Sequence, residues 1–289
     1  MKRIVVTGAK GGTGRSIVQV LSAAGYDVLG LDLAMPGHRE GGYRHADVLD
    51  GASLHELFAG ADGVVHFGSL PTDNWTSNST CYRNLMLGGY NVLQACAQAG
   101  IRRLVYASSM EVYGDLRQQP QLPITEDSPL TTSSIYGTSK VLLERLAADY
   151  CRWHGMSIAA LRLGRIIYEG SWSWRLQAHT QTRERCAECL WCYVDARDVA
   201  DACRLWLQSD VQGFRPFNVA AEDVCIDVPT ADLLAEFYPD LPRHGQLGAF
   251  DCPFVSTALR DTLGWRAQLN WRDIRTEAES AAASGETTQ

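Results

Sequence analysis

The sequence predicts an α/β protein built on a doubly wound parallel sheet. Short apolar runs alternate with amphipathic helical patterns from the first residues onward, and no internal repeat or hinge-like linker interrupts them. The 289 residues, 46% of them hydrophobic, suffice for one large domain or for a domain with a smaller lobe. We expect residues 1–164 to form the first unit, and 165–289 to form mostly a small C-terminal lobe interleaved with the last sheet elements.

The first strand leads directly into a glycine-rich turn and a helix. Residues 4–6 are a β-branched run typical of a buried strand, and helical spacing begins near Ile17. The turn between them has the pattern Thr-Gly-x-x-Gly-x-x-Gly, with glycines at Gly8, Gly11, Gly12 and Gly14. In this context the glycines permit a tight turn, backbone approach to a pyrophosphate and close helix packing. The helix N-terminus, which includes Thr13, offers N–H groups to phosphates.

The second apolar run, 28–31, ends at Asp32, which lies 18 residues after Gly14. A carboxylate about 20 residues beyond such a turn binds the ribose hydroxyls of a dinucleotide. Because it would repel a 2′-phosphate, the pattern favours NAD over NADP. The alternative is an ordinary βαβ turn that is followed by a surface aspartate.

The remaining elements follow in order along the chain. We expect a short helix that ends at 55–59, and helices over 81–99, 134–154, 195–208, 229–237 and 270–280. Strands are expected over 63–67, 103–107, 158–163 and 216–219. The composition of 114–133, rich in Pro, Gln, Thr and Ser, indicates a loop. The polar tail 281–289 is expected to fray.

A second group of residues points to proton transfer. Tyr136 and Lys140 are four residues apart, hence on one face of the predicted helix 134–154. A lysine ammonium beside a phenol lowers the phenol pKa from about 10, which makes Tyr136 a general acid/base for a hydroxyl or carbonyl. Ser109 follows the strand 103–107, at the sheet edge where ligands bind, so it can hydrogen-bond the same oxygen.

In this order the motifs resemble those of the extended short-chain dehydrogenases/reductases of the NAD-dependent epimerase/dehydratase family, from Thr7 to about Trp271. The resemblance implies a Rossmann-type fold with a small C-terminal substrate-binding lobe, and NAD as cofactor. It implies that Ser109, Tyr136 and Lys140 are catalytic, and that Tyr136 and Lys140 also contact the cofactor. Further cofactor contacts implied by it are Asp47, Val48, Phe67, Gly68, Ser69 and Asn84. Substrate contacts are expected from Ser69, Ser109, Met110 and Glu111. For Asp47 and Asn84 the alternative is a helix cap or a surface polar group.

Three departures from the family pattern narrow the choice of substrate and reaction. Arg165 occupies a position where sugar-nucleotide enzymes usually have asparagine. Only 25 positions separate Tyr168 from Tyr193, where members that grip a nucleoside diphosphate carry a longer insertion. Met110-Glu111 stands in place of the Asp-Glu pair of the sugar 4,6-dehydratases, which argues against that dehydration. We expect a free sugar, sugar acid or similar polyol, as in the short uronate dehydrogenases of this family.

Arginines in the shortened region suit an acidic substrate. Arg175, Arg183 and Arg185 lie there, and a guanidinium can hold a carboxylate through two hydrogen bonds. Arg183 is the favoured candidate, and a solvated basic loop is the alternative. Trp172, Trp174 and Trp191 can stack on a sugar face, but packing is the commoner role of tryptophan in a short lobe.

Cysteines of the same region have a spacing that resembles a metal site. Cys186, Cys189 and Cys192 are three residues apart, and His179 is nearby. A zinc or iron–sulfur site needs a fourth ligand from a second paired element, and the sequence shows none. Buried or incidental cysteines are therefore the favoured interpretation, with no metal.

Composition narrows the partners and the location. A formal net charge of −7 argues against a general nucleic-acid or membrane-surface binder, and no apolar run approaches the ~20 residues of a transmembrane helix. Nine scattered cysteines fit a reducing cytoplasm. The resemblance implies a homodimer through helices 81–99 and 134–154. Their apolar outer residues would be Leu85, Leu93, Leu142 and Leu146, although burial within the monomer explains these equally well.

Three functions remain open at this point. The leading hypothesis is an NAD-dependent oxidoreductase that transfers hydride between NAD and a secondary alcohol or ketone of a sugar or sugar-acid-like molecule. The second is a sugar or sugar-nucleotide epimerase that retains its NAD. The third is a non-catalytic regulator that senses dinucleotides. Such regulators commonly lose the tyrosine or the lysine, and this chain has both Tyr136 and Lys140.

Overall fold

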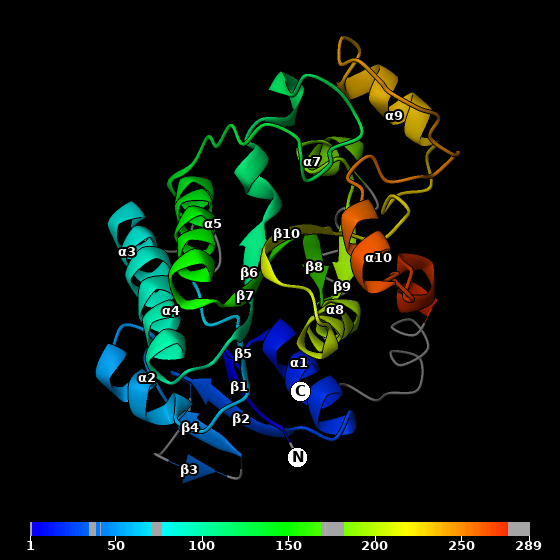
Figure 1. Cartoon of the computed structure of the whole chain (residues 1–289). Coiled ribbons are helices and arrows are strands. Elements are labelled where there is room, and N and C mark those ends of the chain that lie inside the picture. The colour runs from blue at the N-terminus through cyan, green and yellow to red at the C-terminus, as the bar shows by residue number, and fades with distance from the viewer. Residues whose placement is uncertain are drawn as a thin grey trace.

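A parallel sheet forms the centre of the molecule (Figure 1). The computed structural model describes residues 2–34, 39–40, 42–70, 77–168, 171 and 182–276. The strands of the main sheet are β1 (Arg3–Thr7), β2 (Asp27–Asp32), β3 (Arg39–Glu40), β4 (Tyr43–His45), β5 (Gly63–His66), β6 (Arg103–Ser109), β7 (Ser157–Leu163) and β10 (Gly213–Val219). Their order is β10-β7-β6-β5-β1-β2-β4-β3, and only the edge strand β3 is antiparallel. The predicted doubly wound sheet is confirmed.

Helices cover both faces of this sheet. One face carries α1 (Gly12–Ala23), α8 (Ala196–Gln208) and α10 (Thr257–Leu263). The other face carries α2 (Gly51–Phe58), α3 (Asn78–Arg83), α4 (Gly89–Gln98) and α5 (Ile135–His154). Side chains alternate along each strand, so Ile4 and Val6 join the core under α1 whereas Val5 joins the core on the other face. Burial on both faces explains the continuous apolar runs in the sequence.

One helix agrees with its expected end and another departs from its expected course. α2 ends at Phe58, within the expected end at 55–59, and begins at Gly51, where the Asp50 carboxylate accepts a hydrogen bond from the Ser53 N–H at 3.2 Å and caps it. The helix expected over 81–99 begins at Asn78 and contains a π-helical turn, Asn84–Gly88, between α3 and α4. Within the predicted loop 114–133, residues 116–118 form a short 3₁₀ helix.

The C-terminal lobe is assembled from separated segments. β8 (Arg165–Ile167) pairs in parallel with β9 (Tyr193–Asp195), and α7 (Arg183–Ala187) packs near α9 (Thr230–Phe237). Trp191, Phe254 and Trp271 are buried in its core. β10 comes from this half of the chain and lies beside β7 in the main sheet. Residues 271–276 are helical, and the remainder of the predicted helix 270–280 lies outside the described residues. Four other residues considered in the sequence analysis also lie outside them: Trp172, Trp174, Arg175 and His179.

The expected outer faces of α4 and α5 need correction. Leu85, in the π turn, and Leu93, in the core that α4 and α5 share with the sheet, are both buried within the monomer. Leu146 is partly buried against the same core, whereas Leu142 is 42% exposed. The other large apolar side chains exposed on α3, the π turn, α4 and α5 are Tyr82, Leu87, Tyr90, Ile135 and Trp153. Within the described ranges, no helix combines the length and the apolar character needed to cross a bilayer.

Candidate active site

The glycine turn after β1 is shaped for close backbone approach. Gly8 has a φ of +73°, and a Cβ there would overlap the carbonyl of Phe67. A Cβ at Gly14 would collide with the carbonyl oxygen of Gly8, so only glycine lets α1 pack this closely. Gly11 is the N-cap of α1, and no side chain caps the helix. The first N–H groups of α1 therefore point into a site that suits an anion.

Tyr168 is a site-lining residue that the sequence patterns did not single out. A Cβ built at Gly12 would lie 2.5 Å from ring atoms of Tyr168, so the aromatic ring rests directly on the glycine turn. Tyr168 follows β8, far along the chain from Gly12. Only the fold brings the two together, and no local signal marks the contact.

The Asp32 carboxylate is tied to the same turn. Its Oδ2 accepts a hydrogen bond from the Lys10 N–H and its Oδ1 one from the Ala34 N–H, both at 2.9 Å. Lys10 belongs to the glycine turn, and its Nζ lies 4.2 Å from the centroid of the Tyr43 ring. The predicted ribose ligand thus lies at the carboxyl end of β2, beside the predicted pyrophosphate cradle.

The segment after β5 is held against the end of β1 and the π turn. The Phe67 N–H donates to the Thr7 carbonyl at 3.0 Å, and the Gly68 N–H donates to the Thr7 hydroxyl at 3.2 Å. Two residues later, the Leu70 N–H donates to Asn84 Oδ1 at 2.8 Å. Ser69 lies between these anchors, half-buried. The side-chain oxygen of Asn84 therefore has a structural role, and a cofactor contact by it stays a prediction.

Asp47 also has a local partner. Its Oδ1 accepts a hydrogen bond from the Leu49 N–H at 2.9 Å, which shapes the turn before α2, while Asp50 supplies the cap. Val48 is buried against Gly88 of the π turn. This geometry fits the alternative of a local polar role for Asp47, and adenine binding by Asp47 and Val48 stays a prediction.

Ser109 ends β6, where the start of α5 packs against the chain. Its Oγ accepts a hydrogen bond from the Glu111 N–H at 3.2 Å. The Ser134 hydroxyl, at the N-cap of α5, donates to Glu111 Oε2 at 3.0 Å. A Cβ at Gly137 would lie 2.5 Å from the Glu111 carbonyl oxygen, so a glycine is needed for this contact. The residues that flank Tyr136 therefore touch the segment that follows Ser109.

Lys140 lies beneath Tyr136 on α5. Its Nζ is 5.3 Å from the centroid of the Tyr136 ring and donates a hydrogen bond to the Ala107 carbonyl of β6 at 2.6 Å. The residue is only 2% exposed, and burial lowers the pKa of its ammonium to about 8. The helical spacing predicted from the sequence thus places the ammonium beside the phenol, and the hydrogen bond to Ala107 fixes the ammonium to β6.

A buried ion pair, which the sequence analysis did not identify, lies one turn further along α5. The Arg162 guanidinium of β7 donates to Glu144 Oε1 at 3.1 Å and to Oε2 at 2.7 Å. The Ser108 hydroxyl donates to the same carboxylate at 2.6 Å, and the third nitrogen of the Arg162 guanidinium, Nη1, donates to the Tyr113 hydroxyl at 2.8 Å. The pair joins α5 to β6 and β7. Its sequence signal is a single arginine inside an otherwise apolar strand.

His66 gives the site a pH-dependent stability. Its Nδ1 lies 2.7 Å from the Thr7 hydroxyl, and burial, with the nearby Lys140 charge, lowers its pKa to about 3. An unfolded histidine has a pKa of about 6.5, so the unfolded state binds one more proton between these values. The stability that neutral His66 contributes is complete above pH ~6.5 and is lost as the pH falls towards the folded pKa.

We therefore expect the His66→Gln variant to lose less stability on acidification than the parent protein. Between pH 6.5 and 5, the slope of its unfolding free energy should be smaller by up to about 1.4 kcal/mol per pH unit. Denaturant titrations across this range measure the slopes, with His55→Gln, at an exposed position of α2, as the matched control. Equal slopes for His66→Gln and the parent would contradict the assignment.

Arg183 begins α7 and pairs with α9. Its Nη1 lies 3.1 Å from Glu236 Oε2, and its carbonyl accepts a hydrogen bond from the Trp191 indole at 2.8 Å. The side chain is about half exposed. Arg185 lies on the same short helix. Carboxylate binding by Arg183 stays a prediction.

All nine cysteines are buried and none forms a disulfide, which agrees with the preferred interpretation of 186, 189 and 192 as buried residues. In the part of the chain that the structure describes, no group of three or more His, Cys, Asp or Glu side chains is arranged to hold a metal ion.

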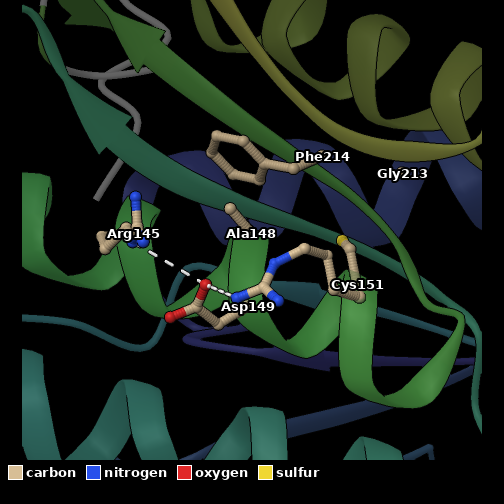
Figure 2. A pocket seen from close by; sticks show the side chains of 7 residues that line it. Arg145, Ala148, Asp149, Cys151, Gly213 and Phe214 are labelled. Carbon is tan, nitrogen blue, oxygen red and sulfur yellow. Dashed lines mark hydrogen bonds and ion pairs between the residues drawn. The ribbon is translucent and has the colours of Figure 1, made fainter.

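A surface hollow of about 410 Å³ lies elsewhere on the molecule (Figure 2). It is lined by Arg145, Ala148, Asp149, Cys151, Arg152, Gly213 and Phe214. Gly213 begins β10, whereas Ser109 ends the parallel strand β6. The hollow is therefore at the amino edge of the sheet, opposite the candidate site, and it has no part in that site.

Comparisons with known proteins agree with this geometry. The model of the NAD dependent epimerase/dehydratase family matches residues 4–220. A UDP-glucose 4-epimerase of Lactobacillus helveticus is 31% identical over 169 residues, covering 55% of this chain and 50% of that protein. A uronate dehydrogenase of Pseudomonas putida is 30% identical over 167 residues, covering 56% of this chain and 60% of that protein. A short-chain dehydrogenase/reductase superfamily protein from Agrobacterium tumefaciens, crystallised with NAD, is 25% identical with a TM-score of 0.74. The match covers 98% of this chain and 97% of that chain.

The chain matches only half of the length of the epimerase relative and three fifths of the length of the uronate dehydrogenase.

Proposed function

Because the chain belongs to the NAD dependent epimerase/dehydratase family, as an enzyme of the short-chain dehydrogenase/reductase type, we propose that it oxidises or reduces a small sugar-like molecule. The reaction is hydride transfer between NAD and a secondary alcohol or ketone of a sugar or sugar acid. The matches confirm the predicted family and Rossmann-type fold, and the predicted cofactor agrees with the NAD dependence of the family.

The carboxyl edge of the sheet fits a dinucleotide. The turn between β1 and α1 packs this tightly only because Gly8 and Gly14 lack a Cβ, and the uncapped N-terminus of α1 offers N–H groups to a pyrophosphate. Asp32 is available to ribose hydroxyls at the end of β2 and favours NAD over NADP. The further contacts proposed on this edge are Thr13, Asp47, Val48, Phe67, Gly68, Ser69 and Asn84.

One observation carries the proposed chemistry: a buried ammonium, fixed to β6, lies beside the phenol of Tyr136. Tyr136 takes the hydroxyl proton of the substrate during oxidation and returns it during reduction. Lys140 stabilises the phenolate that forms and holds the nicotinamide ribose, while the Ser109 hydroxyl steadies the substrate oxygen. Bound NAD supplies the carbon that accepts or donates hydride.

The test is a substrate screen with NAD. Purified protein is incubated with aldoses, uronates and sugar nucleotides, and NADH is followed by absorbance. Net NADH formed from a free sugar or uronate is the expected result. Isomerisation of a sugar nucleotide without net NADH would establish the epimerase alternative, which the epimerase relative keeps open. NAD binding with no turnover of any class would favour the regulator.

An acidic substrate would be recognised by Arg183, with Met110 and Glu111 contacting its other groups. A guanidinium has five N–H donors, and the Glu236 pair uses one of them at 3.1 Å. We expect Arg183→Ala to raise KM for a uronate about tenfold, the value of one charge-assisted hydrogen bond, and to change KM for a neutral aldose less than about twofold. Steady-state kinetics measure both constants, with Arg185→Ala as the matched control. Equal effects on both substrates would remove the assignment.

We also propose a homodimer through the exposed apolar face of α3, α4 and α5. Isolated exposed apolar residues are common, but Tyr82, Leu87, Tyr90, Ile135 and Leu142 lie on neighbouring helices. Light scattering should give twice the chain mass in solution, and a monomer mass at every protein concentration would contradict the dimer. A cytoplasmic location and the absence of nucleic-acid and membrane partners stay predictions.

A further inference from the structure

Four thiols of the C-terminal lobe gather into one group, here named the thiol cluster: Cys186, Cys189, Cys192 and Cys225. The Sγ atoms of Cys186 and Cys225 are 3.9 Å apart, although 39 positions separate the two residues in the chain. The Sγ of Cys189 lies 3.3 Å from the Cys186 carbonyl oxygen. Cys189 also interacts with the thiols of Cys186 and Cys192. The four thiols therefore lie in one group.

The backbone folds tightly to bring these residues together. Leu190 and Trp191 have φ values of +52° and +54°, in the left-handed region that bulky residues rarely adopt. The Trp191 N–H donates to the Cys186 carbonyl at 2.9 Å, and the Cys192 N–H donates to the Cys189 carbonyl at 3.0 Å. This strained turn stacks the three cysteines of the 186–192 segment, and such strain is common where local geometry serves a function.

Cys189 differs from the other three thiols in exposure and in charge environment. It is 6% exposed, whereas the others are fully buried. The Arg165 guanidinium lies 3.9 Å from its Sγ. Hydrogen bonds from the Cys186 and Cys192 thiols lower the pKa of Cys189, and the Arg165 charge acts in the same direction, while the pKa values of Cys186 and Cys192 are raised. The nearby Arg165 guanidinium therefore favours the thiolate, which is the reactive form of cysteine, at Cys189.

We propose that the thiol cluster is an oxidation site, at which a hydroperoxide converts Cys189 to a sulfenic acid and Cys186 then closes a Cys186–Cys189 disulfide. In the first step the Cys189 sulfur attacks a peroxide oxygen, the O–O bond breaks, and water leaves when hydrogen peroxide is the oxidant. The sulfur loses two electrons and the peroxide gains them. In the second step the Cys186 sulfur attacks the sulfenic sulfur, the S–O bond breaks, and the Cys186 proton leaves with the hydroxide as a second water.

The thiol cluster lies next to Met110, one of the residues expected to contact the substrate. The Cys192 Sγ is 3.5 Å from the Met110 Sδ, and Met110 directly follows Ser109. A Cβ at Gly164 would lie 2.9 Å from the same Cys192 sulfur, so the cluster also packs against the end of β7. Among the residues that the structure describes, no cysteine of the cluster contacts the glycine turn. Oxidation should therefore leave NAD binding within about twofold of its reduced value.

Peptide mapping tests the inference without an activity assay. The full chain, with NAD present, is reduced, freed of reductant, treated with hydrogen peroxide and alkylated. Trypsin cuts after Arg185 and Arg197, so one peptide carries Cys186, Cys189 and Cys192. We expect this peptide to lose two hydrogens in a reaction that dithiothreitol reverses. The loss should persist in Cys192→Ala and disappear in Cys186→Ala, where dimedone should label Cys189.

The matched control is Cys203→Ala, which removes a fully buried thiol of α8 remote from the cluster. It should behave as the parent protein, and Cys189 should react at least about tenfold faster than Cys203. Equal oxidation of Cys203 and Cys189, or a link that survives in Cys186→Ala, would overturn the inference. So would one equivalent of zinc in the purified protein, since the thiolates would then be metal ligands.

Discussion

Tyr136→Phe is expected to lower kcat for NADH formation by about 10²–10⁴-fold, the usual contribution of a positioned general acid/base. The substitution removes only the hydroxyl and keeps the ring. The Lys140 ammonium keeps its hydrogen bond to the Ala107 carbonyl, because Tyr136 takes no part in that bond. NAD affinity should therefore change less than about threefold. Steady-state kinetics and a fluorescence titration of NAD separate the two quantities.

The control for this variant is Tyr82→Phe, which removes a phenol hydroxyl from an exposed position on α3. It should leave both constants at their parent values. Turnover that survives unchanged in Tyr136→Phe would place the chemistry elsewhere in the molecule. Loss of NAD binding in parallel with turnover would mean that the hydroxyl serves binding rather than proton transfer.

The largest effect on stability is expected from Glu144→Leu. This change leaves the Arg162 guanidinium without its carboxylate, and the side chain is only 4% exposed. Removing one member of a buried ion pair costs about 3–5 kcal/mol, because the remaining charge stays buried without compensation. Denaturant titration measures the loss in unfolding free energy. The double variant Glu144→Leu/Arg162→Met should recover most of it, since no uncompensated charge remains.

Asp149→Ala is the matched control on the same helix. Asp149 pairs with Arg145 and Arg152 at the surface of α5, and such exposed pairs contribute less than about 1 kcal/mol. A loss below about 1 kcal/mol for Glu144→Leu would contradict the stabilising role of the buried pair. So would a double variant that is no more stable than the single one.

Local patterns are sufficient to predict the helix that carries Tyr136 and Lys140 and the glycine turn between β1 and α1. Tyr136 and Lys140 share a face through the geometry of one helix alone, and the strand, glycine turn and helix at the N-terminus are contiguous. Each of these features depends on residues fewer than about twenty positions apart, and the structure keeps them in the expected places.

Features that depend on distant packing were not predicted. The Glu144–Arg162 pair forms only once α5 lies against β7, and Tyr168 reaches Gly12 only once β8 is in place. Helical periodicity marks an apolar stripe at Leu85 and Leu93 without telling which neighbour covers it, so the sequence leaves an outer face and burial within the monomer equally open, and the structure buries both. In the same way, the 186–192 spacing was visible in the sequence, but the contact with Cys225 required the folded lobe.

A crystal structure of the protein with bound NAD would test the central claim most directly. The proposed mechanism predicts the pyrophosphate on the turn between Gly8 and Gly14, with the nicotinamide ring facing the Tyr136 hydroxyl and Lys140 at its ribose. A nicotinamide ring bound away from that hydroxyl, with no closing movement able to join them, would contradict the assigned chemistry while leaving the fold unchanged.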